Sequence, residues 1–512
     1  MKNSQIKIGI IISYITTAIE ILTYLIYTPL LTQVLGQSEY GVYTVVSSFV
    51  GYLSLFSCGF GSAYLRHYSI YKIEKKQKEI DGLNAMFLVV FMIMGLLAGI
   101  TGMYLALNVD TVLGHKITVS EVEIARKLMI ILVVNIVLSF PISVFNAIIT
   151  ANECYVFQKA LDLIRKLFNP ILTIPLLFAG YKSVAVVMVT TCLTLLALLV
   201  NILYCFGKLH TKFDFKFMKF GLLKSIAAFS FFVFINMIVD QINWNVDKFL
   251  LIRYSGSAAV AVYGVASLVN SMYMQLSTQV SSLFSPRVNL MVAQNEKEMD
   301  EKLTKLFIEV GRIQFMILNL VLFGFIVFGR YFLNHWVGAG YSNAYAVVLL
   351  LITSVTIPLI QNLGIEIQRA KNQHKFRSLV YLLIAVFNIT VSIPLARQYG
   401  EIGCAIGTAG SLLIGNGLIM NWYYHKKMGI NVVRFWKSIL QMSKALIPVI
   451  ILACCIISFI PFRTSLQYLS GIMIFTGVYS ISMWIFGLNI EEKQLLIKTM
   501  KKMREKKYEN RN

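Results

Sequence analysis

The chain has 512 residues, of which 57% are hydrophobic and only 14% are charged. An ordinary soluble protein has roughly 45–50% apolar and about 25% charged residues, so this composition excludes a water-soluble globular protein and a disordered chain. The formal net charge of +22 would indicate nucleic acid as the partner of a soluble protein, but in a membrane protein the question is where the charges lie, and we expect no nucleic acid.

The apolar runs predict fourteen transmembrane helices, because a bilayer core about 30 Å thick takes about 20 helical residues. After Lys2 and Lys7 the first apolar run continues to about Leu35, which is too long for a cleaved signal peptide. We therefore expect an all-α polytopic membrane protein. The predicted cores are residues 8–35, 41–64, 84–107, 128–149, 163–180, 183–205, 225–252, 258–284, 306–332, 345–363, 378–397, 402–424, 445–461 and 467–488.

The basic residues predict the orientation of these spans. With an even number of spans both termini lie on one side, and 36 of the 46 Lys and Arg residues belong to that side. Nine belong to the other side, and Arg312 lies inside a span. The positive-inside rule therefore places both termini in the cytoplasm.

No enzyme, metal or cofactor is expected from the remaining sequence. The longest outer connection, about 108–127, is too short for a catalytic domain. The seven cysteines show no C-x-x-C spacing and are odd in number, which favours neither a metal site nor a disulfide framework.

An internal repeat relates the two halves of the chain. Residues 151–176 align without a gap with residues 370–395, with eight identities in 26 positions, and a similar shift aligns Tyr40-Gly41 with Tyr263-Gly264. Spans 1–6 thus map onto spans 7–12 in the same orientation, which predicts two six-helix lobes around a central cleft and favours a carrier over a channel or enzyme. A duplicated scaffold without transport is the alternative. The expected parts are an N-terminal lobe (1–205), a cytoplasmic linker (206–224), a C-terminal lobe (225–424), additional helices 13 and 14 (425–488) and a basic cytoplasmic tail (489–512).

The tail from Glu491 to Asn512 carries eight basic and four acidic residues. Leu496, Met500 and Met503 recur in it at helical spacing. Two interpretations stay open: the tail lies on the anionic inner leaflet, or it is a solvated segment that only fixes the topology.

One face of predicted span 7 carries four polar side chains, spaced 4, 3 and 4 residues apart. They are Asn236, Asp240, Asn243 and Asp247. By helical rise, Asp240 lies well inside the bilayer, whereas Asp247 and Lys248 approach its outer surface. An ionisable residue at the bilayer centre costs about 2.5–3.5 kcal/mol or more, so this stripe needs a wet or paired environment.

Span 1, which occupies the same place in the other half, carries a similar stripe with Glu20 near mid-depth. Its members are Ser13, Thr17, Glu20, Tyr24 and Tyr27. We hypothesise that both stripes face the cleft, that Glu20 or Asp240 binds a coupling H⁺ or Na⁺, and that the two tyrosines line a site for sugar rings. The alternative is hydrogen bonding between helices of a closed bundle.

Few cations lie where an anionic substrate could reach them. Arg312, inside span 9, is the first candidate. Arg66, Arg165 and Lys166 lie at the inner ends of spans, where positive-inside residues normally accumulate, so they are weaker candidates. Lys248, beside Asp247, is a further weaker candidate.

Three features carry a resemblance to a known family: the turn Leu-Gly-x-x-Glu-Tyr-Gly-x-Tyr at residues 35–43, the six-plus-six repeat with two extra helices, and the two polar stripes. By these features the chain resembles the oligosaccharide flippase branch of the multidrug/oligosaccharidyl-lipid/polysaccharide (MOP) flippase superfamily. The resemblance covers essentially the whole chain. It implies a carrier that moves an undecaprenyl-pyrophosphate-linked oligosaccharide across a bacterial plasma membrane for surface polysaccharide biosynthesis. Glycosyltransferases and a polysaccharide polymerase would then be its partners.

Three alternatives remain. A cation-coupled multidrug antiporter of the same superfamily is favoured by Glu20 and Asp240 and disfavoured by fourteen spans. A lipid II flippase is expected to have a cavity richer in arginine. A membrane-embedded glycan polymerase or acyltransferase should show a large outer loop or a deep histidine, and the sequence shows neither.

Overall fold

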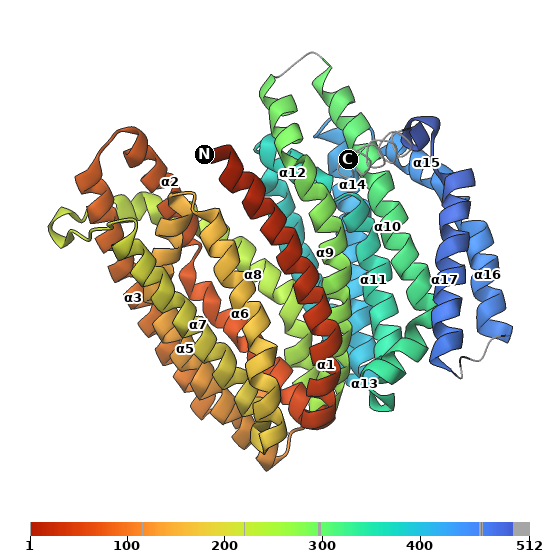
Figure 1. Ribbon diagram of the computed structural model, residues 1–512, viewed down its shortest axis with the longest axis horizontal. Coiled ribbons are helices and arrows are strands. Elements are labelled where there is room, and N and C mark those ends of the chain that lie inside the picture. The colour runs from red at the N-terminus through yellow and green to blue at the C-terminus, as the bar shows by residue number, and fades with distance from the viewer. Residues whose placement is uncertain are drawn as a thin grey trace, which may run out of the picture. The chain divides into compact units, whose positions relative to one another are not determined.

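The computed structural model describes residues 2–114, 116–219, 221–294, 298–459, 462 and 464–494. Within these residues the chain is a succession of helices and forms no β-strand, as Figure 1 shows. The expected all-α fold is therefore confirmed. Leu496, Met500 and Met503 of the tail lie outside the described residues, and Ser13 lies outside those with described side chains.

The α-helices are α1 (Lys2–Ser54), α2 (Phe60–Ile73), α3 (Gln77–Leu107), α4 (Val109–Leu113), α5 (Val119–Ala151), α6 (Tyr155–Leu176), α7 (Lys182–Gly207), α8 (Leu222–Tyr254), α9 (Ser257–Gln294), α10 (Met299–Trp336), α11 (Ala344–Ile360), α12 (Leu363–Ala370), α13 (His374–Leu412), α14 (Met420–Lys426), α15 (Val432–Ser443), α16 (Leu446–Phe459) and α17 (Ser465–Ser482). Single π-helical turns at Leu177–Tyr181, Leu413–Ile419 and Met483–Gly487 continue α6, α13 and α17.

The long apolar helices make this a multi-pass membrane protein. Among the described residues, eight helical runs are long and apolar enough to cross a membrane, and two bent helix pairs raise this to ten. Three of these runs have 43, 53 and 51 residues, more than twice the roughly 20 residues of one span. The polar helix α8 is not among the eight. The count of fourteen stays a prediction.

A single glycine interrupts each of the three overlong runs. Gly36, Gly180 and Gly400 have φ values of 71°, 91° and 56°, in the left-handed region that a side chain disfavours. Each glycine falls at or between the limits predicted for consecutive spans. At the motif of residues 35–43, however, the expected turn shrinks to Gly36 alone, because the backbone is helical again from the next residue to Ser54.

The chain divides into two compact units, which are described separately. Unit 1 comprises Met1–Val265, Trp336–Asn343 and Ala385–Gly407. Unit 2 comprises Ala266–His335, Ala344–Ile384 and Thr408–Asn512. The division falls inside α9 and α13, and the sequence-based limits of the two lobes stay predictions.

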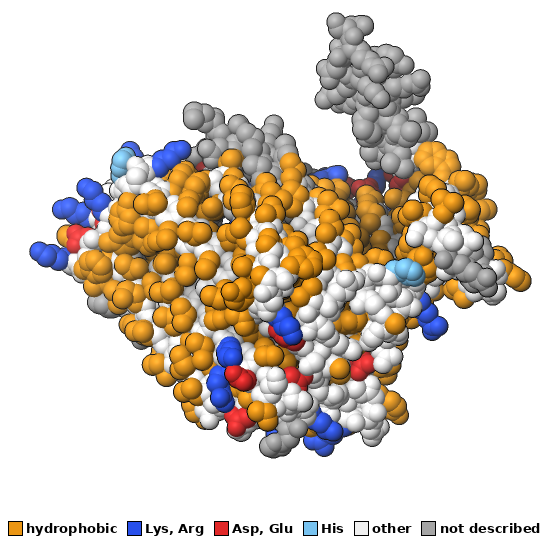
Figure 2. All heavy atoms as spheres, turned by 60° about the horizontal axis from the view of Figure 1, so that its bottom comes forward, with side chains coloured by type: hydrophobic (Ala, Val, Ile, Leu, Met, Phe, Trp, Pro, Cys, Tyr) orange, Lys and Arg blue, Asp and Glu red, His pale blue; other side chains and the backbone are white. Residues whose placement is uncertain are grey.

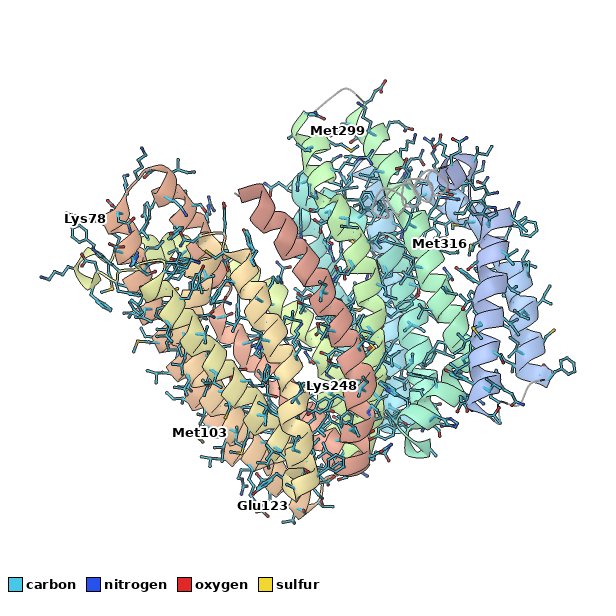
Figure 3. The ribbon with its side chains drawn as sticks, viewed as in Figure 1. Lys78, Met103, Glu123, Lys248, Met299 and Met316 are labelled. Carbon is cyan, nitrogen blue, oxygen red and sulfur yellow. The ribbon has the colours of Figure 1, made fainter. Side chains whose placement is uncertain are left out.

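The core of unit 1 is a cluster of aromatic and aliphatic side chains from α2, α3 and α5. At its centre Tyr64 is fully buried and donates a hydrogen bond of 2.7 Å to Asn84 Oδ1. Lys78 at the start of α3 and Glu123 at the start of α5 lie at opposite ends of the bundle (Figure 3). The two helices are thus antiparallel, which matches their assignment to consecutive spans.

The motif at residues 35–43 holds several parts of unit 1 together. Gln37 donates to the Gly340 carbonyl at 3.0 Å. Ser38 donates to Glu121 Oε1 at 2.5 Å, and Ser257 Oγ donates to the same oxygen. The motif therefore joins α1 to the starts of α5 and α9 and to the segment after α10.

Glu39 of this motif acts at the start of α7. Its Oε1 accepts hydrogen bonds from the backbone N–H of Ser183 at 3.0 Å and from Ser183 Oγ at 2.5 Å. A carboxylate at a helix N-terminus satisfies an otherwise unpaired N–H and interacts favourably with the helix dipole. Glu39 is therefore a structural residue that fixes α7 beside α1.

The two glycines that the repeat aligns both lie at close approaches in unit 1. A Cβ on Gly41 would lie 1.9 Å from the Ser257 carbonyl oxygen, and one on Gly264 would lie 2.9 Å from Thr44 Cγ2. Small residues let membrane helices approach closely. These contacts explain why glycine stands at both positions.

Unit 2 is built around α10. Phe307 of α10 packs on Phe435 of α15 with ring centroids 4.8 Å apart. Phe328, further along α10, meets Phe475 of α17 edge to face at 5.7 Å. Tyr479 of α17 also donates to the Met316 carbonyl at 2.6 Å. Helix α10 is thus held by α15 at one part and by α17 along another.

The outer surface is largely apolar. Hydrophobic side chains predominate on the face in Figure 2, and charged ones are few. Large apolar side chains such as Ile100, Leu203 and Leu418 are 68%, 71% and 69% exposed. Such exposure is unfavourable in water and expected in lipid.

Candidate functional site

A polar pocket of about 350 Å³ lies in unit 1 between α1, α6 and α7. Charged groups, tyrosine rings and small hydroxyl or amide groups line most of it, together with the apolar Pro170 and Val186. The lining side chains used below are Glu20, Thr23, Tyr24, Tyr27 and Tyr43 of α1, Arg165, Lys166 and Asn169 of α6, and Thr190 and Thr194 of α7.

An ion pair is the main feature of this pocket. Lys166 Nζ lies 2.6 Å from Glu20 Oε2. The other carboxylate oxygen, Oε1, accepts a hydrogen bond of 3.1 Å from the Tyr24 hydroxyl. The side chains of Lys166 and Glu20 are 34% and 23% exposed. The pair is therefore neither fully buried nor freely solvated.

Helical spacing explains how α1 and α6 present these groups. Glu20, Tyr24 and Tyr27 are four and seven residues apart, so they share one face of α1. On α6, Lys166 and Asn169 are three residues apart and share a face in the same way. Asn169 Nδ2 donates to Thr190 Oγ1 of α7 at 2.9 Å, which fixes α6 against α7.

This arrangement allows Lys166 to exchange its ion-pair partner. The Lys166 ammonium has three donors, and within the described residues Glu20 is its hydrogen-bond partner. Arg165 contacts Asp162 at 3.3 Å on the same helix. An anion that enters the pocket could take Lys166 from Glu20, and a proton or cation on Glu20 would release the lysine.

The polar stripe of α8 has other surroundings, and none of its members lines this pocket. Asp247 is buried and accepts a hydrogen bond from the Tyr263 hydroxyl. Asn243 is buried, and its amide has no hydrogen-bond partner among the described residues. Asp240 is exposed, and Asn236 is partly buried. A role for this stripe in binding stays a prediction.

Two of the remaining candidates also lie elsewhere in unit 1. Lys248 donates to Asn245 Oδ1 on its own helix at 3.2 Å. Arg66 is exposed on α2 and does not line the pocket.

The side chain of Arg312 was expected to face the central cleft, but it lies in a buried network of hydrogen bonds. In unit 2 its side chain is 3% exposed, and Nε lies 2.6 Å from Glu492 Oε1. Nη2 donates to Glu492 Oε2 at 2.8 Å and to the Gly487 carbonyl at 2.7 Å. Nη1 contacts the carbonyl and hydroxyl oxygens of Ser438, both at 3.2 Å. These acceptors occupy all five guanidinium donors, which favours a structural role. Arg312 also lines a polar pocket of about 760 Å³ in unit 2, so a binding role for it stays a prediction.

The pairing of Lys166 is not evident from the sequence. Its place at the start of span 5 agrees with the positive-inside bias, and the structure pairs it with Glu20 of a helix 146 residues away. One signal was available, because Arg165 and Lys166 both fall inside the predicted core 163–180 of span 5. An ionisable residue within a span indicates a partner or a functional site.

The pocket lies in a part of the chain that known proteins share. Residues 7–287, more than half of the chain, match the model of the polysaccharide biosynthesis protein family. The chain belongs to this family. All the residues that line the pocket fall inside the matched range.

Individual relatives agree with this family. A candidate O-antigen transporter of Shigella flexneri is 20% identical over 406 residues, which cover 77% of this chain and 92% of that protein. The solved lipid II flippase MurJ, in an inward closed conformation, has a TM-score of 0.74 at 18% identity and covers 93% of this chain and 98% of its own. An inward-facing multidrug resistance transporter of the MATE family gives 0.62 at 16% identity, with 82% and 96% covered. The fold is that of MOP superfamily transporters.

Proposed function

We propose that this protein is a flippase that moves a lipid-linked oligosaccharide, carried on undecaprenyl pyrophosphate, across the bacterial plasma membrane by alternating access. Membership of the polysaccharide biosynthesis protein family and a transporter fold support a flippase. The observation that carries the choice of substrate is the pocket of unit 1, where Lys166 and Arg165 lie beside tyrosine rings and hydroxyl groups.

The chemistry of the pocket suits the polar end of such a substrate. A pyrophosphate is an anion that lysine and arginine bind by charge-assisted hydrogen bonds, and Tyr24 and Tyr27 offer rings on which a sugar can stack. The volume of about 350 Å³ is near the lower end of the range of ligand pockets, roughly 300–1,000 Å³. The pocket therefore fits the pyrophosphate and an adjoining sugar rather than a complete oligosaccharide.

The Glu20–Lys166 pair offers a route to coupling by H⁺ or Na⁺. While Glu20 is ionised and binds neither a proton nor Na⁺, its carboxylate forms an ion pair of 2.6 Å with the ammonium of Lys166. A proton or Na⁺ on Glu20 neutralises the carboxylate and leaves Lys166 for the pyrophosphate. Asp240, exposed on α8, is the second candidate for the coupling ion.

We place both termini in the cytoplasm, because 36 of the 46 basic residues lie on their side of the predicted topology. Glycosyltransferases on that side would supply the substrate, and a polymerase on the outer side would consume it.

The experiment that tests the function is flipping in proteoliposomes. A fluorescent oligosaccharide on a polyprenyl pyrophosphate is placed in the inner leaflet of the vesicles, where it is protected from a membrane-impermeant quencher. The quencher then reports how much of the probe reaches the outer leaflet. Purified protein should make about half of the protected probe accessible. If the protein leaves the probe protected, and its expression instead raises tolerance to cationic dyes without rescuing a flippase-deficient strain, the multidrug antiporter is the better assignment.

Coupling is tested in the same vesicles with an imposed gradient of protons or sodium. We expect Glu20→Gln to flip the probe at a rate that no longer responds to the gradient, with Asp240→Asn as the second variant. Glu123→Gln is the matched control, because Glu123 forms an exposed ion pair with Lys127 at 2.7 Å. Full gradient-dependent activity of both Glu20→Gln and Asp240→Asn would refute coupling through these carboxylates.

A further inference from the structure

Helix α15 of unit 2 meets the apolar helix that follows it, α16, at an angle. The axes of α15 and α16 are bent by 47° at the break between them. Helix α16 is apolar throughout, and its Ile447 and Ile451 are 57% and 60% exposed. A short helix with an apolar side and a basic side suits the membrane surface, and on this ground we place α15 there.

One face of α15 is fixed to the protein. Phe435 is fully buried, and its ring lies against the backbone at Gly311 of α10. Trp436 donates from its indole N–H to Asn421 Oδ1 at 2.8 Å. The orientation of α15 about its own axis is therefore set by packing, and its free face is a preformed surface.

The free face carries apolar and basic groups side by side. Val433 and Leu440 are 67% and 65% exposed, and they are seven residues apart, so they share one side of the helix. Lys437 and Lys444 have the same spacing on the adjacent side. With Trp436 and Gln441 these side chains line an open pocket of about 510 Å³.

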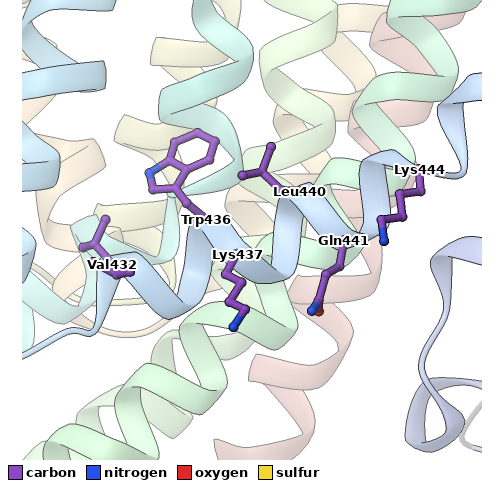
Figure 4. A pocket seen from close by; sticks show the side chains of 7 residues that line it. Val432, Trp436, Lys437, Leu440, Gln441 and Lys444 are labelled. Carbon is purple, nitrogen blue, oxygen red and sulfur yellow. The ribbon is translucent and has the colours of Figure 1, made fainter.

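Figure 4 shows how these groups are divided. Trp436 and Leu440 point to one side of α15, and Lys437, Gln441 and Lys444 point to the other. Within the part of the chain that the structure describes, neither lysine has an acidic partner. Arg434, by contrast, is paired with Glu301 of α10. Lys437 also lines a neighbouring pocket with Glu309, Glu491 and Glu492, so these carboxylates share its field, whereas the positive charge of Lys444 is available to an outside group.

We propose that this face of α15 binds an anionic phospholipid of the surrounding bilayer. The acyl chains lie along Val433, Leu440 and the Trp436 ring, in continuation of the apolar face of α16. The phosphodiester lies between Lys437 and Lys444, which stand about 10 Å apart along the helix, and Gln441 between them can donate a further hydrogen bond.

Charge and polarity together select this occupant. Basic residues at a membrane surface attract anionic lipids, and lysine extends its charged end toward the headgroups while its stem covers apolar surface. A soluble phosphate would leave Val433 and Leu440 exposed to water, whereas the acyl chains of a phospholipid cover them.

The test measures lipid retention by native mass spectrometry of the full-length protein. The protein is extracted from vesicles of equal parts phosphatidylglycerol and phosphatidylcholine. We expect the double variant Lys437→Gln/Lys444→Gln to retain phosphatidylglycerol roughly 30-fold more weakly, equivalent to about 2 kcal/mol for two basic residues. The matched control is Lys212→Gln/Lys216→Gln, which removes two exposed lysines from the connection before α8 and should change nothing.

Two further arms identify the occupant. Leu440→Ser should weaken retention of the phospholipid, and glycerol 3-phosphate in millimolar excess should not displace it. Displacement by the soluble phosphate, with Leu440→Ser unchanged, would overturn a lipid site in favour of a simple phosphate site. Equal losses in the two double-lysine variants would also overturn the proposal, as would a smaller dimer fraction of Lys437→Gln/Lys444→Gln in light scattering.

Discussion

Two ion pairs in this protein have the same length, but the surroundings of their cations differ. Lys166–Glu20 in unit 1 and Arg312–Glu492 in unit 2 both measure 2.6 Å. Lys166 is 34% exposed in a polar pocket, whereas Arg312 is 3% exposed. The arginine is also bound by oxygens of Ser438 and Gly487.

The difference shows that distance does not reveal what an ion pair does. Breaking a buried pair by removing one partner is costly, because the other charge stays behind without compensation. A partly exposed pair contributes little to stability, so its charges can change partners at small cost. We therefore expect Arg312 to stabilise the fold and Lys166 to take part in binding.

The largest effect should follow the loss of the carboxylate that pairs with Arg312. Glu492→Met leaves the buried guanidinium of Arg312 without its carboxylate and should lower the free energy of unfolding by about 3–5 kcal/mol, measured by unfolding in mixed dodecyl sulfate micelles. The double variant Arg312→Met/Glu492→Met should recover most of this, because apolar replacement of a whole buried pair is often neutral. Normal stability with lost flipping in the single variant would instead make this ion pair functional.

Lys166→Gln should impair flipping and leave stability nearly unchanged. Flipping in proteoliposomes should fall roughly 10- to 100-fold, because a hydrogen bond to a charged group contributes about 1.5–3 kcal/mol. Its free energy of unfolding should stay within about 1 kcal/mol of the parent. Lys127→Gln, which breaks the exposed pair with Glu123, is the matched control. Equal flipping by both variants would remove Lys166 from the site.

Glu39→Leu sharpens the comparison inside unit 1, since this carboxylate is 8% exposed and binds Ser183. We expect the free energy of unfolding to fall by about 1–3 kcal/mol because a buried N–H loses its acceptor. Flipping per folded molecule should be unchanged, and Glu39→Gln, which keeps an oxygen acceptor, should be milder. A specific loss of flipping would contradict the structural role.

The smallest effect is expected from Tyr24→Phe. It removes the hydrogen bond of 3.1 Å to Glu20 and keeps the ring, so flipping should fall roughly two- to tenfold for a loss of about 0.5–1.5 kcal/mol. Tyr104→Phe, at a tyrosine that is 66% exposed on α3, serves as the control. A Tyr24→Phe variant as active as this control would show that the hydroxyl is dispensable.

Local spacing predicted what lies on one helix, and it could not predict what meets across helices. Glu20, Tyr24 and Tyr27 share a face of α1 by periodicity alone, and all three line the pocket. Their partner Lys166 is 146 residues away, and the partner of Arg312 is 180 residues away. Spacing along one chain does not show which helices meet, so the face of α1 that carries Glu20 was predictable, whereas its pairing with Lys166 was not.

The breaks between helices also show what the sequence could and could not predict. Gly36, Gly180 and Gly400 were predictable as ends of spans from glycine and the apolar run lengths. The sequence did not show that the break at residues 35–43 is confined to Gly36. Contacts far along the chain, such as the one between Gln37 and Gly340, accompany this short break.

The bond between Arg312 and Glu492 also sets a limit for shortening or tagging the chain. A chain cut before residue 492 loses the carboxylate and keeps a buried guanidinium, whereas one cut after residue 494 keeps the pair. The start of the tail, up to Glu492, is therefore part of the folded unit 2. A fusion partner is best attached beyond it, and a protease that removes residue 492 should loosen α15 as well as the tail, because Ser438 of α15 shares the same arginine.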